Sequence, residues 1–267
     1  MNTQAILDQA DALFAAGQAP QAASLLEDAL AGAGAAGDWG ARLTFINELM
    51  GYYRSTSRME QAWAYAEQAR KILEEHSLSG SLAGVTTLLN IATVYRADRR
   101  PAEALELYAE VEQVYLAAGL QGDYRLGGLY NNMAVSALEA GRTEDAVSYG
   151  RRAVAALDGA EGVAGERATA LSNLAAALLW NKEEEAAEAC LEQALTLFEH
   201  EAAGDPHYGG ALSARAYLAF RRGEEEQALT LYRRAMEVTR RAFGENRDYQ
   251  RLAANVRALE QRKEQRD

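Results

Sequence analysis

The sequence predicts an all-α chain in which six helical hairpins follow one another and a single helix closes the C-terminal end. Three observations predict this fold class. Apolar residues make up 49% of the chain, alanine and leucine are the commonest of them, and there are only three prolines, a composition that favours helix. Alanines at positions expected to pack between two helices recur at intervals of 40 to 42 residues. Glycine-containing connectors recur at nearly the same interval, as expected of stacked repeats.

The repeat is clearest where the segment starting at Asn90 is aligned with those starting at Asn132 and Asn173. Each repeat shows a helical pattern, a tight turn and a second helical pattern. Small residues twelve positions before and seven positions after one marker alanine would let the two helices approach closely. The marker alanines are Ala22, Ala62, Ala104, Ala146, Ala187 and Ala228. We expect one domain, 1–267, with repeats at 2–36, 38–78, 81–121, 123–160, 164–203 and 206–244.

The turn inside each repeat falls five residues before the marker alanine. In three repeats this residue is a glycine, which readily adopts the positive φ that ends a helix. The other three repeats carry Ser57, Arg99 and Lys182 there, so we expect a less strictly specified turn in those repeats. After the sixth repeat, residues 246–266 show only a first-helix pattern, which predicts a capping helix whose apolar face covers the last hairpin.

The charge balance bears on partners and location. A net charge of −12 argues against direct binding of nucleic acid, which requires a basic surface. Residues 207–267 nevertheless carry a net charge of +4 and the remainder −16, so head-to-tail self-association is possible, although simply solvated helix faces explain the pattern as well. No apolar run approaches the ~20 residues that span a bilayer, and the start lacks a signal peptide. We therefore expect a cytoplasmic protein without membrane contacts.

No set of residues predicts catalysis, a cofactor or a metal site. Cys190 is the only cysteine, so neither a disulfide framework nor a cysteine-based zinc site can form within the chain. The connector from His200 to His207 contains acidic residues as well, but lacks the i, i+4 spacing that presents two metal ligands on one helix face. We therefore expect no enzyme. The three tryptophans, Trp39, Trp63 and Trp180, fall at core or groove spacing and are expected to pack.

The segment from Leu129 to Ala146 carries the small residue of the first helix, the turn glycine and the second-helix alanine that resemble a tetratricopeptide repeat. The family's common period is 34 residues. The ~42-residue period here, with asparagine at the start of the first-helix motif, is similar to the repeats of kinesin light chains and related bacterial regulators. The resemblance implies a right-handed α-α superhelix whose first helices line a concave groove. Two departures are the missing closing proline in most repeats and Gly150, which replaces the expected second-helix aromatic.

If the first helices line a groove, the residues that face it share one helical stripe, which we call the groove stripe. It consists of the positions 18, 15, 14, 11, 8 and 7 residues before each marker alanine. An asparagine there can donate to and accept from a peptide backbone at once. The asparagines could equally fix the packing between repeats, and both roles remain open. Arg54, Arg96 and Arg221 could pair with acidic groups of a ligand. The predicted peptide-binding residues are Asn47, Arg54, Asn90, Arg96, Asn131, Asn132, Asn173, Tyr217 and Asn255.

The function expected from these features is that of a non-catalytic adaptor or scaffold that binds a peptide or partner segment in the groove. The alternative is a ligand-sensing module of a larger bacterial regulator. Arginine outnumbers lysine 24 to 3, which favours a GC-rich bacterial genome, where such regulators are common.

Overall fold

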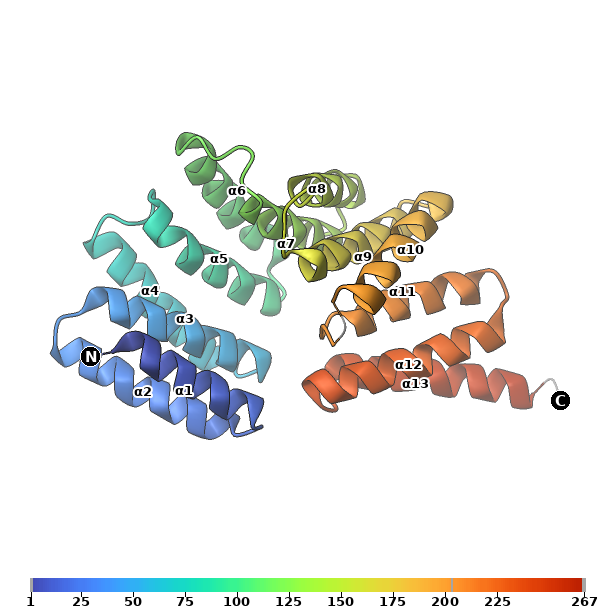
Figure 1. Ribbon diagram of the computed structural model, residues 1–267, viewed down its shortest axis with the longest axis horizontal. Helices are drawn as coiled ribbons and strands as arrows, with labels where there is room; N and C mark the ends of the chain where they lie inside the picture. Colours follow the sequence, from blue (N-terminus) through green and yellow to red (C-terminus); the bar gives the residue numbers. More distant parts are fainter. Residues whose placement is uncertain (1, 203, 266–267) are drawn as a thin grey trace. The chain divides into compact units, whose positions relative to one another are not determined.

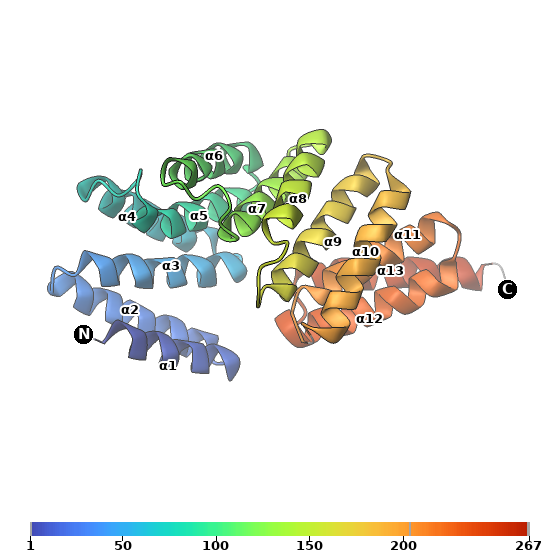
Figure 2. The same ribbon diagram turned by 45° about the horizontal axis from the view of Figure 1, so that its top comes forward.

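The computed structural model describes residues 2–202 and 204–265, and in these residues it contains thirteen α-helices and no strand. The helices pair in sequence order as antiparallel hairpins, so the predicted all-α fold class, six hairpins plus a capping helix, is confirmed (Figures 1 and 2). The predicted limits at residues 203 and 266 lie outside the described residues. The hairpins are α1 (Thr3–Ala15) with α2 (Ala19–Ala35), α3 (Trp39–Ser55) with α4 (Met59–Glu75), α5 (Leu82–Ala97) with α6 (Pro101–Ala117), α7 (Arg125–Glu139) with α8 (Thr143–Ala156), α9 (Ala164–Trp180) with α10 (Glu184–His200), and α11 (Tyr208–Arg221) with α12 (Glu225–Phe243), followed by α13 (Arg247–Glu264).

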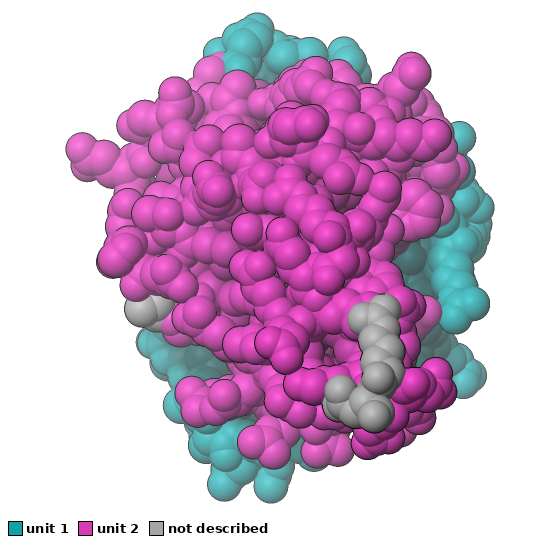
Figure 3. All heavy atoms as spheres, turned by 90° about the vertical axis from the view of Figure 1, so that its right-hand side faces the viewer, with its two compact units in different colours: residues 1–121 teal, residues 122–267 magenta. Residues whose placement is uncertain are grey.

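The chain forms two compact units, which Figure 3 colours separately. Residues 1–121 hold α1 to α6, and residues 122–267 hold α7 to α13. Within each unit the two helices of a hairpin contact each other, and the first helices of successive hairpins are also in contact: α3 with α5, α7 with α9, and α9 with α11. The first helices therefore form a continuous layer from α7 to α11 in the second unit, and α3 packs directly against α5 in the first unit. That the whole chain behaves as one domain remains a prediction.

The marker alanines explain why the hairpins pack so tightly. All six, from Ala22 to Ala228, have an exposed fraction of 0%. A methyl group at this place lets the second helix approach the first within close-packing distance, and a larger side chain would push the two apart. At the place of the missing aromatic, Gly150 in α8 allows a close approach to the next hairpin. A Cβ atom there would lie 3.0 Å from Leu174 Cδ1, so Leu174 of α9 occupies the space.

The turns are more uniform than the sequence predicts. The glycines five residues before a marker, including Gly141, have φ between +72° and +80°, but Ser57, Arg99 and Lys182 also have φ between +60° and +64°. In every repeat the next N–H donates to the carbonyl five residues earlier, for example Arg142 N to Ala137 O at 2.8 Å. This is the bond that closes a Schellman helix end. The expectation of a looser turn in the three repeats without glycine is therefore wrong.

The capping helix α13 covers the last hairpin through the face predicted for it. Leu252, Val256 and Leu259 are buried together with residues of α11 and α12. Charged side chains of α13 outside this apolar face also pair with α12, and Arg233 of α12 donates to Glu260 at 2.6 Å. A single helix with one apolar stripe thus ends the array and leaves a polar surface to solvent.

Candidate functional site

The predicted groove residues lie on the first helices of the hairpins and on α13, in both compact units. In the first unit, α3 carries Asn47 and Arg54, and α5 carries Asn90 and Arg96. In the second unit, the asparagines are on α7, α9 and α13, and Tyr217 is on α11.

In the first unit one asparagine is used for packing and another is not. Asn47 donates through Nδ2 to Thr87 Oγ1 at 3.1 Å, which joins α3 to α5. Asn90 is half-buried, and its side chain makes no hydrogen bond to any described residue. A half-buried amide without a partner retains its full capacity to donate and accept, so Asn90 can serve a ligand that reaches it.

Two arginines stand close together near the C-terminal ends of the same two helices. Burial, and then the positive charge of Arg96, lower the pKa of the Arg54 guanidinium. Because arginine stays protonated in proteins, the two side chains still form a positively charged spot on α3 and α5. Arg54 makes no hydrogen bond or ion pair with a described residue. A carboxylate placed here would relieve the repulsion and accept hydrogen bonds from Arg54.

In the second unit the asparagines pair in a way that the sequence does not indicate. Asn173 of α9 donates through Nδ2 to Asn131 Oδ1 of α7 at 2.9 Å. Asn132, next to Asn131, is half-buried and its side chain makes no hydrogen bond to a described residue. The contact between repeats is thus made by Asn131, and the neighbouring Asn132 is left available. Asn255 of α13 is also half-buried.

The tryptophans, Tyr217 and Arg221 differ from one another in their exposure and in their contacts. Trp180, the last residue of α9, is 74% exposed, so the prediction that it packs is wrong, whereas Trp63 packs and donates to Asp98 Oδ2 at 3.0 Å. The sequence did contain a signal that Trp180 is exposed. It lies seven residues before the marker alanine Ala187, which places it on the groove stripe. Tyr217 is 43% exposed, and its role in binding remains a prediction. Arg221 is already paired with Glu184 at 2.8 Å.

A pocket of about 410 Å³ opens at the N-terminal ends of α7 and α9, and sequence reasoning did not predict it. The connector before α11 and the end of α8 complete its wall, because Asp205, Pro206, His207 and Leu157 also line it. We call it the α7–α9 pocket. Its other lining residues are Gly127, Gly128, Asn131, Asn132, Gly165, Glu166 and Thr169.

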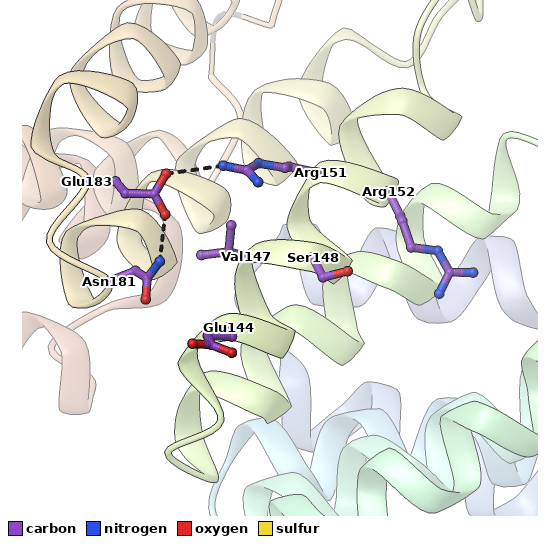
Figure 4. A pocket seen from close by; sticks show the side chains of 7 residues that line it. All are labelled: Glu144, Val147, Ser148, Arg151, Arg152, Asn181 and Glu183. Carbon is purple, nitrogen blue, oxygen red and sulfur yellow. Dashed lines mark hydrogen bonds and ion pairs between the residues drawn. The ribbon is translucent and has the colours of Figure 1, made fainter.

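A second pocket of about 470 Å³ lies between α8 and the turn that joins α9 to α10 (Figure 4). Figure 4 shows Arg151 extending toward Glu183, with which it pairs at 3.2 Å, while Arg152 points away. Asn181 donates to the same Glu183 at 2.6 Å. Arg152 instead donates to Tyr130 Oη at 2.6 Å. The charged groups of this pocket are therefore largely satisfied by each other, and it offers a ligand less than the first pocket does.

Three further features concern metal binding, thiol reactivity and membrane insertion. Within residues 2–202 and 204–265, no group of three or more His, Cys, Asp or Glu side chains is placed to hold a metal ion. Burial raises the pKa of the Cys190 thiol, which reduces its nucleophilic thiolate form. Among the described helices, none has both the length and the apolar character needed to cross a bilayer.

Comparison with solved structures gives several similar folds. BtubC (BKLC) from P. vanneervenii is 24% identical, with a TM-score of 0.64 over 74% of this chain and 80% of that one. A putative kinesin light chain from Podospora anserina with nearly identical TPR-like repeats is 18% identical, with a TM-score of 0.59 over 76% and 97% of the two chains. A Rap protein complexed with competence and sporulation factor is 16% identical, with a TM-score of 0.67 over 96% and 73%. Identities this low support the fold alone.

Comparison by sequence identifies the family. Curated proteins give no match. Family profiles described as tetratricopeptide repeat match residues 85–159, and residues 167–202 and 210–248, which together make up more than half of the chain. Kinesin light chain-like proteins are among the structural neighbours, in agreement with the long repeat. From its repeat geometry and these matches, the chain belongs to the tetratricopeptide repeat family.

Proposed function

We propose that this chain is a non-catalytic adaptor that binds an extended segment of a partner protein along its first helices. The observation that carries the proposal is the amide ladder, defined as Asn90, Asn132 and Asn173, which stand at the same place in three successive repeats. Asn90 and Asn132 are half-buried, and their side chains make no hydrogen bond to a described residue. An amide in this condition can both donate to and accept from a peptide backbone.

One side chain of the amide ladder is held in place before a ligand binds. Each asparagine projects from the middle of a helix, and Asn173 is further held by its bond to Asn131 at 2.9 Å. Because the Asn173 side chain is already fixed in place, it loses little conformational entropy when a ligand arrives, so more of its hydrogen-bond energy appears as affinity. The tetratricopeptide fold typically mediates protein–protein interactions, which agrees with a partner-binding role.

The groove stripe also indicates which side chains the partner segment carries. Arg54, which makes no ion pair with a described residue, would attract an acidic side chain in the first compact unit. In the second unit, Trp180 and Tyr217 offer exposed aromatic rings of the kind that anchor interfaces. We therefore propose a partner segment with acidic and apolar side chains.

The remaining expectations are part of the same proposal. The arginine-rich, lysine-poor composition supports a bacterial protein, and we place it in the cytoplasm. The net charge of −12 supports a protein or peptide partner over nucleic acid. Self-association through the basic C-terminal segment and the acidic remainder would be tested by sedimentation at low and high salt, since screening weakens such contacts.

The proposal is tested by replacing the whole amide ladder with alanine. Proteins captured from a lysate by the wild-type chain are identified, and the affinity of a synthetic segment from the captured partner is then measured by fluorescence polarisation. Three lost hydrogen-bonding side chains at ~1 kcal/mol each predict roughly 100-fold weaker binding. The control removes three exposed amides from second helices, Gln68, Gln113 and Gln193, and should leave affinity unchanged.

Equal affinity of the ladder variant and wild type, at equal helicity, would contradict the proposal. The sensory-module alternative makes a further distinction: a bound segment would change the small-angle X-ray scattering profile of the chain. An adaptor keeps the same profile apart from the added mass of the segment.

A further inference from the structure

The α7–α9 pocket has an acidic wall. Of the described residues that line it, two are carboxylates, Glu166 and Asp205, and none is lysine or arginine. The nearby Arg167 is engaged elsewhere, in an ion pair with Asp158 at 2.9 Å. The first turns of α7 and α9 also border the pocket, and each helix N-terminus supplies about half a positive charge. Two full carboxylate charges outweigh these two half charges, so the pocket favours a cation.

The position of Asp205 depends on a glycine far away in the sequence. A Cβ atom on Gly165 would lie 2.5 Å from Asp205 Oδ2, so only glycine at this place lets the carboxylate lie against the first turn of α9. The other oxygen, Oδ1, accepts the backbone N–H of His207 at 2.7 Å. One carboxylate oxygen is thus anchored, which holds the Asp205 side chain in the pocket wall.

The pocket also contains hydrogen-bonding groups that the protein itself does not satisfy. Thr169 Oγ1 is buried and has no hydrogen-bond partner. The side chains of Asn132 and Glu166 make no hydrogen bond to a described residue. A buried hydroxyl oxygen normally has a partner, so Thr169 Oγ1, beside the half-buried Asn132 and the exposed Glu166, points to a ligand that supplies a donor.

We propose that the α7–α9 pocket binds a cationic nitrogen group, a guanidinium or primary ammonium, through Glu166, Asp205, Thr169 and Asn132. A guanidinium carries five N–H donors and no acceptor, which matches a wall of two carboxylates, a hydroxyl and an amide oxygen. The volume of about 410 Å³ is within the range of small-ligand sites and accommodates such a group with the chain that carries it. The cation comes either from a side chain of the partner segment or from a free amine.

The inference rests on the proposed function only for the first of these sources. Asn132 belongs to both the pocket and the amide ladder, whereas Asn90 and Asn173 do not line the pocket. Replacing Asn90 alone with alanine therefore weakens the partner segment and spares cation binding, whereas Asn173 is kept because its side chain bonds to the pocket residue Asn131. Failure of the adaptor proposal and failure of the pocket proposal are distinguishable in this way.

The experiment titrates the full chain with three probes, followed by ¹H–¹⁵N NMR. The probes are a capped glycine–serine peptide with one arginine, the same peptide with citrulline in place of arginine, and agmatine as the free amine. Citrulline keeps the shape and loses the charge, so we expect it to bind at least about tenfold more weakly, the size of one lost charge-assisted bond. Tighter binding of the peptide than of agmatine assigns the cation to a partner side chain, and the reverse assigns it to a free amine.

Two kinds of variant distinguish the effect of the carboxylate charges from the effect of the pocket volume. Glu166→Gln and Asp205→Asn should each weaken the arginine peptide about tenfold, while Glu161→Gln, an exposed acid outside the pocket, should not. Gly128→Leu fills the pocket without changing charge, since a Cβ atom at Gly128 meets nothing within 4 Å, and should abolish binding. Equal binding of the citrulline peptide, equal losses in the Glu161 and Glu166 variants, or no binding of either cation in the millimolar range would each overturn the proposal.

Discussion

The same substitution, glycine to alanine, should have opposite effects at two positions in the hairpin of α7 and α8. Gly141 follows the end of α7 with φ +75°, and its N–H donates to Leu138 O at 3.0 Å. Gly128 lies within the first turn of α7, is exposed, and has open space where a Cβ atom would be. Gly141→Ala forces an L-residue into the left-handed region, whereas Gly128→Ala places it in an unhindered helix.

The magnitudes follow from the backbone alone, because neither methyl group would touch a neighbour within 4 Å. The left-handed conformation costs an L-residue about 1–2 kcal/mol. Restricting the unfolded chain by replacing glycine returns about 0.4–1 kcal/mol. Gly141→Ala should therefore lower the free energy of unfolding by roughly 1 kcal/mol. Gly128→Ala has no such conformational cost and should raise it by about 0.5–1 kcal/mol.

Urea unfolding followed by far-UV circular dichroism measures both changes, and thermal unfolding gives a second reading. A change of about 1 kcal/mol corresponds to ~2–4 °C in Tm for a chain of this size. Lys182→Gly extends the test, because Lys182 has φ +64° without being glycine, and should be stabilising by up to about 1 kcal/mol. Shifts of the same sign at Gly141 and Gly128 would refute the account of the turns.

Three further predictions concern packing, proton binding and thiol access. Ala146→Leu, at a marker alanine with 0% exposure, should overpack α7 against α8 and destabilise by about 1–3 kcal/mol in the same urea assay, whereas an unchanged midpoint would contradict close packing. The hydroxyl of Tyr53 donates to Glu27 Oε1 at 2.6 Å, and this bond, followed by burial, raises the pKa of Tyr53 to about 12. The folded state then holds that proton more tightly than the unfolded state, so this contribution to stability is complete below pH 10 and falls as the pH rises toward about 12. Absorbance titration should show several late-titrating tyrosines, and Glu27→Gln should lower the pKa of Tyr53 and of Tyr65, whose hydroxyl also donates to Glu27, while Tyr208 stays late. Since burial raises the pKa of Cys190, its alkylation by iodoacetamide at neutral pH should be markedly faster in urea than in the native chain, and equal rates would argue that the thiol is open.

The fold could be predicted from the sequence because each repeat has the same types of residue at the same positions. A buried alanine, a small partner residue and a connector glycine return every 40 to 42 residues, and each reports a steric requirement that the structure then satisfies. The turns at Ser57, Arg99 and Lys182 could not be predicted this way, since their positive φ is imposed by the flanking helices and leaves no glycine in the sequence. Backbone conformation imposed by packing is not visible in residue type.

The candidate site was only partly predictable for a related reason. Helical register correctly places Asn173 and Asn132 on equivalent first helices, but it does not show that Asn173 bonds to Asn131 instead. The α7–α9 pocket was missed because its acid comes from a connector: Asp205 meets Gly165 from 40 positions further along the chain. Within-helix spacing does not predict such contacts. Trp180 was missed although its register placed it on the groove stripe.

The distribution of unsatisfied polar groups is the strongest argument for where a partner binds. On the second helices and their turns, charged side chains pair with one another, as Arg151 does with Glu183 and Arg234 does with Glu199. On the first helices, half-buried Asn90 and Asn132 hold amides without partners among the described residues. An amide that only water can satisfy exchanges that water for a ligand at little cost, whereas the paired groups of the second helices would first have to break their ion pairs. A bound segment would therefore gain more hydrogen bonds on the first helices than on the second helices, which supports our proposal that the first helices form the binding face.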